Sequence, residues 1–105
     1  MQIRKFDECA DLLKVLAHPT RLAILDSLKN GKKCVTDVAE LLSTPQPNVS
    51  QHLSLLRREG IVTYSEEGAK RCYSIIDLAF IKVLLKVLES RASKTEPVTE
   101  EAVLA

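Results

Sequence analysis

The fold is decided by residues 35–60, which read VTDVAELLSTPQPNVSQHLSLLRREG. Apolar residues at helical spacing predict a short helix over 35–42 and a longer one over 46–58, with Val49, Leu53 and Leu56 as the buried side chains of the second. Residues 43–45 (Ser-Thr-Pro) predict a turn between them, because a helix tolerates proline only in its first turn. Two helices joined by so short a turn are typical of a helix–turn–helix.

Working outward, the same patterns predict helices on both sides and one β-hairpin. Two apolar-periodic stretches precede the pair, and β-branched and aromatic runs followed by an apolar stretch come after it. The predicted elements are helices over 7–17, 19–28 and 78–91 and strands over 61–64 and 71–75, joined by a connection over 66–70. This order predicts a mainly α fold, a winged helix–turn–helix of five helices with a two-stranded hairpin wing. Residues 1–92 form one predicted domain, and 93–105 a polar, acidic, flexible tail.

Composition sets limits on the class of protein. The chain has 105 residues, 46% hydrophobic and 28% charged, which excludes a disordered chain and a disulfide-rich miniprotein. The formal net charge of +1 excludes a strongly basic nucleic-acid coat protein. Residues 95–105 hold three glutamates and no Lys or Arg, so residues 1–94 carry 15 positive and 11 negative groups, or +4. A local basic patch for nucleic acid is therefore compatible with the composition.

Neither a signal peptide nor a membrane span is predicted. The first residues have no apolar core, and the most apolar stretch, 76–88, is interrupted by charges and shorter than the ~20 residues that a span needs. We therefore expect a cytoplasmic protein with no membrane partner. In that reducing compartment structural disulfides are rare, and the three cysteines are an odd number, so we expect no disulfide framework.

The last helix predicts a dimer. Its apolar residues surround all but one narrow stripe, formed by Lys82, Lys86 and Glu89. A helix packed on one small domain needs only one apolar face. We therefore expect a homodimer in which the first and last helices cover the same helices of a second chain.

Polar chemistry is concentrated at the N-terminal end of the helix over 46–58. Gln and Asn side chains bond bidentately to adenine, and Ser serves a base or a phosphate. The predicted DNA contacts at this end are Gln46, Asn48, Ser50 and Gln51. Basic side chains follow at Arg57 and Arg58 and on the hairpin at Lys70 and Arg71, where phosphate contacts would fix the register of the protein on a duplex.

Three segments carry a resemblance to a known family: AHPTRLAIL at 17–25, VAELL at 38–42 and QPNVSQHLSLLRREGIV at 46–62. Together they closely resemble the ArsR/SmtB family, over about residues 6–91. That resemblance implies a dimeric winged-helix repressor of bacteria that binds double-stranded DNA at a palindromic operator and senses metals, metalloids or thiol chemistry. It places Gln46, Pro47, Asn48, Ser50 and Gln51 on the DNA-reading segment and Lys70 and Arg71 on the wing. His52 stands where the family often has histidine, and we interpret it as a packing or phosphate-contacting residue.

The family's ligand sites match only in part. The zinc-type site on the last helix retains Asp77, but Ala79, Ser90 and Ser93 stand at its other positions. The thiolate-type site, Cys-Val-Cys-Asp, reads Cys34-Val35-Thr36-Asp37, so its second cysteine is absent. Cys34 lies at a predicted helix N-terminus, which favours a thiolate, and thiolates bind soft ions strongly.

The cysteines therefore define the predicted effector site. Cys34 is the leading ligand, Cys9 of the same or a second chain a second one, and Cys72 a weaker candidate than either. As(III) or Sb(III) leads as effector because these ions need no histidine or carboxylate. Two alternatives remain: a redox or persulfide response through Cys9 and Cys34, and a winged-helix protein-interaction module with no metal effector. No Cys-x-x-Cys, glycine-rich phosphate loop, carboxylate pair or catalytic triad indicates an enzyme.

Overall fold

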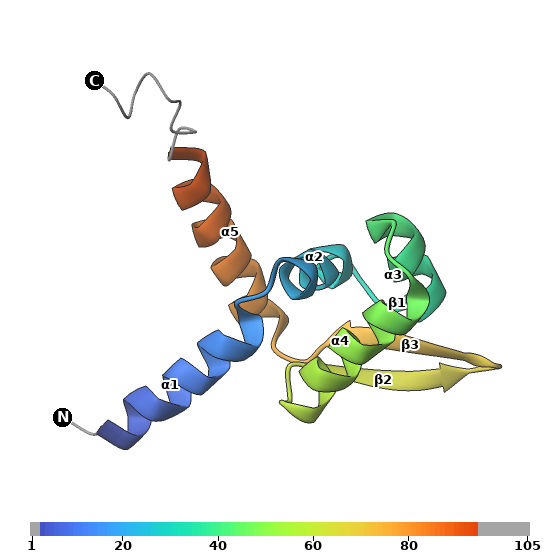
Figure 1. Cartoon of the computed structure of the whole chain (residues 1–105), viewed down its shortest axis with the longest axis horizontal. Coiled ribbons are helices and arrows are strands. Elements are labelled where there is room, and N and C mark those ends of the chain that lie inside the picture. Colours follow the sequence, from blue (N-terminus) through green and yellow to red (C-terminus); the bar gives the residue numbers. More distant parts are fainter. Residues whose placement is uncertain (1–2, 95–105) are drawn as a thin grey trace.

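The computed structural model describes residues 3–94 and confirms the winged helix–turn–helix (Figure 1). The elements are α1 (Ile3–Leu16), α2 (Pro19–Leu28), β1 (Lys33–Cys34), α3 (Val35–Leu42), α4 (Gln46–Arg58), β2 (Val62–Glu67), β3 (Lys70–Ile75) and α5 (Leu78–Lys94). Helix α5 thus ends three residues beyond the predicted Arg91. Residues 95–105, which make up most of the predicted tail, lie outside the described residues.

The wing differs from the predicted two-stranded hairpin, because a third strand joins it. Strand β3 is central, with β2 on one side and the two-residue β1 on the other, all antiparallel. The hairpin itself is tighter than predicted, since Glu67 pairs with Lys70 and only Gly68 and Ala69 form the turn. Gly68 has φ +66°, the left-handed backbone that two-residue hairpin turns demand of their first position.

The core lies between α2, α3, α4 and the sheet. Its fully buried members include Ile24 and Leu25 of α2, Val38 of α3 and the predicted stripe of α4. That stripe is confirmed, because Val49, Leu53 and Leu56 are each 0% exposed. Burying one such side chain stabilises the fold by about 1.5–3 kcal/mol, so the stripe fixes which face of α4 remains outside.

The turn between α3 and α4 is held by backbone hydrogen bonds. Ser43 adopts a left-handed conformation with φ +50° after the last residue of α3. Its N–H donates to the carbonyl of Glu40 (3.2 Å), and the N–H of Thr44 donates to that of Ala39 (3.0 Å). These bonds satisfy carbonyls that the end of α3 leaves free, and Pro45 then starts the next helix in a new direction.

Helices α1 and α5 extend away from the winged body and diverge from each other (Figure 1). Asp77 caps α5, with Oδ1 accepting a hydrogen bond from the N–H of Phe80 (3.1 Å). The two helices bury little apolar surface within the chain. Their exposed large apolar side chains are Phe6, Leu13, Leu78, Phe80, Val83, Val87 and Leu88.

We predict that Leu53→Ala lowers the free energy of unfolding by about 2–5 kcal/mol, because it leaves a cavity where α4 meets the core. Leu41→Ala is the matched control, since Leu41 is 62% exposed on α3 and its truncation should cost no more than about 0.5 kcal/mol. Denaturant unfolding of both variants at one protein concentration measures the difference. Equal losses of stability would contradict the assigned core.

Candidate nucleic-acid interface

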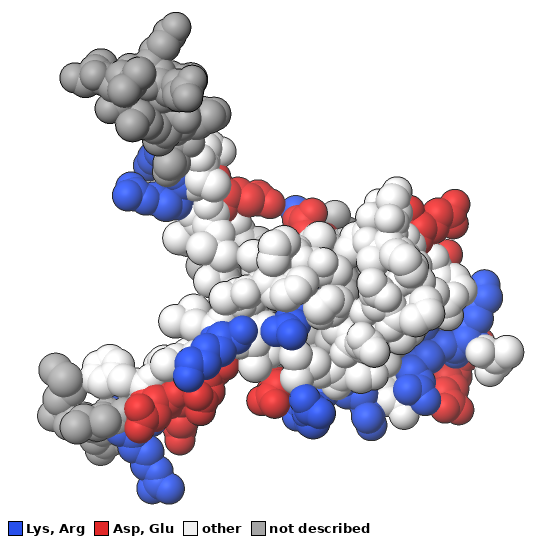
Figure 2. All heavy atoms as spheres, viewed as in Figure 1, with Lys and Arg blue, Asp and Glu red and all other residues white. Residues whose placement is uncertain are grey.

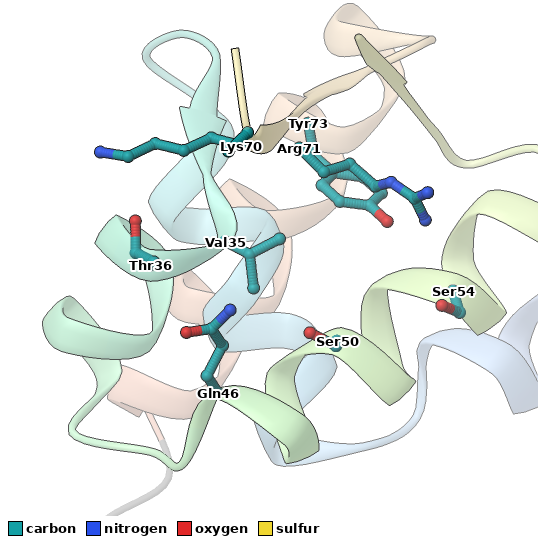
Figure 3. A pocket seen from close by; sticks show the side chains of 9 residues that line it. Val35, Thr36, Gln46, Ser50, Ser54, Lys70, Arg71 and Tyr73 are labelled. Carbon is teal, nitrogen blue, oxygen red and sulfur yellow. The ribbon is translucent and has the colours of Figure 1, made fainter. Parts of the chain in front are cut away.

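A cleft of about 260 Å³ separates α4 from the wing. Helix α4 contributes Gln46, Ser50 and Ser54 to its lining, and β3 contributes Lys70, Arg71 and Tyr73. Figure 3 shows the α4 side chains on one wall and the β3 side chains facing them, with Val35 and Thr36 of α3 at one end. The cleft thus joins amide and hydroxyl groups to two cationic side chains.

The other predicted residues of α4 lie on its outer face. Pro47, Asn48 and Gln51 are exposed in the first turns, together with Gln46, while Ser50 is half-buried. The structure therefore presents all five predicted residues at one helix end, as base-edge contact in a major groove requires. Lys and Arg side chains gather along the edge that α4 and the wing form, among a few acidic ones (Figure 2).

A stack of two arginines on one tyrosine joins α4 to the wing. The guanidinium of Arg57 lies 4.4 Å from the ring centroid of Tyr64, and that of Arg71 lies 4.2 Å from the same centroid. Tyr64 in turn packs against the ring of Tyr73, its partner across the two strands, at 5.6 Å. Such cation–π contacts are worth about 0.5–1 kcal/mol each at exposed sites. Tyr64 thus holds two of the three predicted phosphate-contacting arginines, Arg57 and Arg71, a role that the sequence did not reveal.

Arg71 has further partners on the wing. A hydrogen bond with Tyr73 is the main cause that raises the pKa of Arg71 above its ordinary value, followed by the charge interaction with Tyr64. Its Nη2 also lies 3.8 Å from Oε1 of Glu66, an exposed and therefore weak ion pair. Arg71 is held in place as a cation, and its ion pair with Glu66 opens at little cost.

His52 lies on the inner side of α4, toward α2, and not in the cleft. Its Nδ1 accepts a hydrogen bond from Nε of Arg21 (3.3 Å), and its ring lies 4.5 Å from that of His18. Partial burial is the main cause that holds the pKa of His52 below its ordinary value, followed by the charges of His18 and Arg21. Arg21 also donates through Nη1 to the carbonyl of Val15 (2.9 Å), so the cluster ties the end of α1 to α4.

The cysteines are arranged differently from the expectation. Cys34 and Cys72 form a disulfide, so the expectation of no such bond is wrong for this pair. The reason is the additional strand, because the β1–β3 register places Cys34 directly opposite Cys72. Cys9 is exposed on α1, which Figure 1 shows on the other side of α2 from that pair. Among residues 3–94, no three His, Cys, Asp or Glu side chains form a group that could hold a metal ion.

The fold and this interface define a winged helix–turn–helix DNA-binding protein, and comparison with known proteins places it more closely. Residues 18–64 match the family model described as "Bacterial regulatory protein, arsR family". An HTH-type transcriptional regulator of Methanocaldococcus jannaschii is 36% identical over 88 residues, which cover 83% of this chain and 98% of that protein. The chain belongs to the ArsR family of transcriptional regulators, and it is not an enzyme.

Other relatives and structures agree with this assignment. The repressor SmtB of Mycobacterium tuberculosis is 37% identical over 75% of this chain, which spans only 58% of that protein. The arsenical resistance operon repressor of Staphylococcus xylosus is 37% identical over 67% of each chain. The structure of HlyU from Vibrio cholerae matches with a TM-score of 0.74 and 29% identity, over 82% of this chain and 97% of that one. Over residues 3–94, no helix has the length and apolar character that crossing a membrane requires.

We predict that Tyr64→Leu weakens binding to duplex DNA about 5- to 30-fold, because two cation–π contacts of about 0.5–1 kcal/mol each no longer position Arg57 and Arg71. The slope of log affinity against log salt should also fall, by about one for each phosphate that the protein no longer binds. Tyr64→Phe keeps the ring and should restore both the affinity and the slope. Fluorescence anisotropy at several salt concentrations measures both quantities, and a Phe variant as weak as the Leu variant would contradict the stack.

Proposed function

We propose that the chain is a homodimeric transcriptional repressor that binds a palindromic operator in double-stranded DNA and is released by a thiol-reactive signal. The observation that carries this proposal is the interface between α4 and the wing, where base-reading groups and phosphate-binding cations occupy one surface. In this proposal the protein works in the cytoplasm, residues 1–92 form the DNA-binding and dimerisation domain, and residues 93–105 form a flexible tail.

Each side of the interface has a distinct task. Gln46, Asn48 and Gln51 at the exposed end of α4 contact base edges in the major groove. Arg57, Lys70 and Arg71 contact phosphates, which fix the position of α4 but carry little sequence information. Specificity therefore rests on the amides of α4, and the salt-dependent part of the affinity rests on the cations.

The dimer is supported by the exposed apolar faces of α1 and α5. A monomer would leave Phe6, Leu13, Val83 and Val87 between 54% and 62% exposed, an unusual number of exposed large apolar side chains for two helices. A two-fold axis beside these helices covers the same surface on both chains. It also holds two copies of α4 at one fixed separation, as a palindromic operator requires.

The effector in this proposal is As(III), Sb(III) or another soft metal ion, bound by the reduced thiolates of Cys34 and Cys72. The two residues are direct cross-strand partners, so one thiophilic ion reaches both sulfur atoms. The third donor comes from Cys9 of a second copy or from a thiol in solution. The Staphylococcus xylosus relative is named as an arsenical resistance operon repressor, which supports this class of effector.

A second candidate signal is redox chemistry, because Cys34 and Cys72 already form a disulfide. In either case release follows from coupling. A ligand of the reduced thiols, or loss of the disulfide, that favours another arrangement of α3 and the wing lowers the population of the DNA-binding arrangement. Reciprocity requires DNA to weaken effector binding by the same factor.

For DNA recognition, we predict that Gln46→Ala and Asn48→Ala lower the preference for operator over unrelated DNA, by about 1–3 kcal/mol for each bidentate pairing with a base that the variant removes. Lys70→Ala should instead weaken binding to both DNAs by the same factor, because it removes only a phosphate contact. Gel shifts on the promoter fragment and on a scrambled duplex, at one stated salt concentration, separate the two effects. No shift with any duplex would instead favour a protein-interaction module.

For the effector, we predict that arsenite releases the reduced wild-type protein from DNA and that Cys34→Ser requires at least about tenfold more, since only one of the two chelating thiolates remains. Arsenite titration of the preformed complex, followed by anisotropy, gives both midpoints. Equal midpoints for the two proteins would remove Cys34 from the mechanism.

A further inference from the structure

We infer that Cys34 and Cys72 form a reversible thiol–disulfide site that fastens the wing to the helix–turn–helix and thereby sets the affinity of the α4–wing cleft for DNA. The inference rests on the proposed DNA-binding function. It goes beyond that function because it assigns a redox modification to two named residues, with low-molecular-weight disulfides as the oxidant.

The position of the bond is the first argument. Cys34 is the last residue of β1 and the residue that precedes α3, while Cys72 lies in the central strand β3. The bond therefore connects α3 to the wing across 38 residues of sequence. The next residues of α3, Val35 and Thr36, line the cleft at one end, and the neighbours of Cys72 line its β3 wall.

The bond lies behind the cleft and leaves it open. Successive side chains of a strand point to opposite faces, so Cys72 lies on the other face of β3 from Arg71 and Tyr73. The disulfide thus fixes β3, the strand that carries the DNA-facing cations, and does not occupy the cleft itself. Changing the redox state of the two cysteines therefore alters the mobility of β3 but changes none of the side chains that contact DNA.

Few other contacts join β1 to the wing. Strand β1 has only two residues, and their partners in β3 are Tyr73 and Cys72. An ion pair between Lys32 and Glu67 (2.7 Å) is half-exposed at both side chains and therefore contributes about 0–1 kcal/mol. Because so short a strand pairing is weak, the covalent bond is the strongest link between β1 and β3, and it adds to the packing of Val35 and Tyr73 in the shared core.

The two sulfurs differ in their exposure to solvent, as a thiol–disulfide site requires. Cys34 is half-buried, and as the residue that precedes α3 it makes no side-chain cap hydrogen bond. The N–H groups of the first turn of α3 therefore remain available to stabilise its thiolate. Cys72 is only 1% exposed. Cys34 is thus the sulfur that meets a reagent from solution, and Cys72 is the one that completes the exchange.

The chemistry balances as two exchange steps. The thiolate of Cys34 attacks a small disulfide RSSR, forming a mixed disulfide at Cys34 and releasing one RS⁻. The Cys72 thiol loses its proton to solvent and attacks the Cys34 sulfur of the mixed disulfide, which forms the Cys34–Cys72 bond and releases the second RS⁻. The protein loses two electrons and two protons, and RSSR is reduced to two thiols. A dithiol in excess reverses both steps.

The disulfide form is the one that binds DNA more tightly. A fastened wing loses less conformational freedom when its cations meet phosphates, and this preorganisation favours the complex. Reduction leaves β3 more mobile relative to the start of α3 and weakens binding, with an expected change of about five- to tenfold. Thiophilic ions act in the same direction, because they capture the reduced thiols and prevent the bond from forming again.

The test uses the full-length protein equilibrated with oxidised glutathione or with dithiothreitol. Mass spectrometry should show a peptide pair joined through Cys34 and Cys72 only in the first sample. Anisotropy with duplex DNA, after removal of the reagent, should show about five- to tenfold tighter binding by the oxidised protein. Cys9→Ser is the matched thiol control, and we expect it to keep both the crosslink and the response because Cys9 is exposed on α1.

Cys34→Ser and Cys72→Ala should each bind DNA like the reduced protein under both conditions. Cys34 is only half-buried, so its variant keeps the test valid if loss of the buried Cys72 side chain impairs folding. Failure of the crosslink to form, or equal or weaker DNA binding by the crosslinked protein, would overturn the inference. Loss of DNA binding in both redox states would instead reject the proposed function, while the mass measurement would still report on the redox site.

Discussion

The burial of one stripe of α4 is the interaction on which the rest of the structure depends. Val49, Leu53 and Leu56 are completely removed from solvent against α2, α3 and the sheet. A helix has no freedom to rotate once three side chains of one face are packed in this way. The same packing therefore fixes the opposite face, with its amides and hydroxyls, toward the outside. Recognition of DNA and stability of the fold are two consequences of one helical periodicity.

The exposed face is useful only if α4 is also placed correctly relative to a second copy. That connection runs through Arg21, which donates both to His52 on α4 and to the last turn of α1. Helix α1 belongs to the proposed dimer surface. A shift of α1 would therefore be transmitted through the hydrogen bonds of Arg21 to α4, the proposed DNA-reading helix. His52 stays an acceptor at Nδ1 while it is neutral, and its lowered pKa keeps it neutral over a wider range of pH than an exposed histidine.

The sequence predicted what depends on periodicity and local chemistry. The helix–turn–helix and the buried residues of α4 follow from spacing within single elements, and the structure confirms both. The sequence did not predict β1, because a strand of two residues is too short to show an alternating apolar pattern. The Cys34–Cys72 bond and the arginines on Tyr64 were missed for a related reason, since each joins residues that only the tertiary register brings together. An aromatic residue facing basic positions in a predicted hairpin was the available signal for the stack.

The charges on the wing limit how much of the DNA affinity the wing can supply. Glu66 and Glu67 face Arg71 and Lys32 through ion pairs at the surface, so a phosphate that approaches the wing competes with carboxylates already present. Each pair is exposed and weak, and a phosphate displaces it at small cost. The net gain per contact is correspondingly small, and the excess charge of residues 1–94 is only +4. Affinity from the wing alone would therefore be low at physiological salt, because only a few counterions are released. A tight complex needs two copies of α4 in the groove together, so in the proposed dimer the spacing set by α1 and α5 is as important for binding as any single contact.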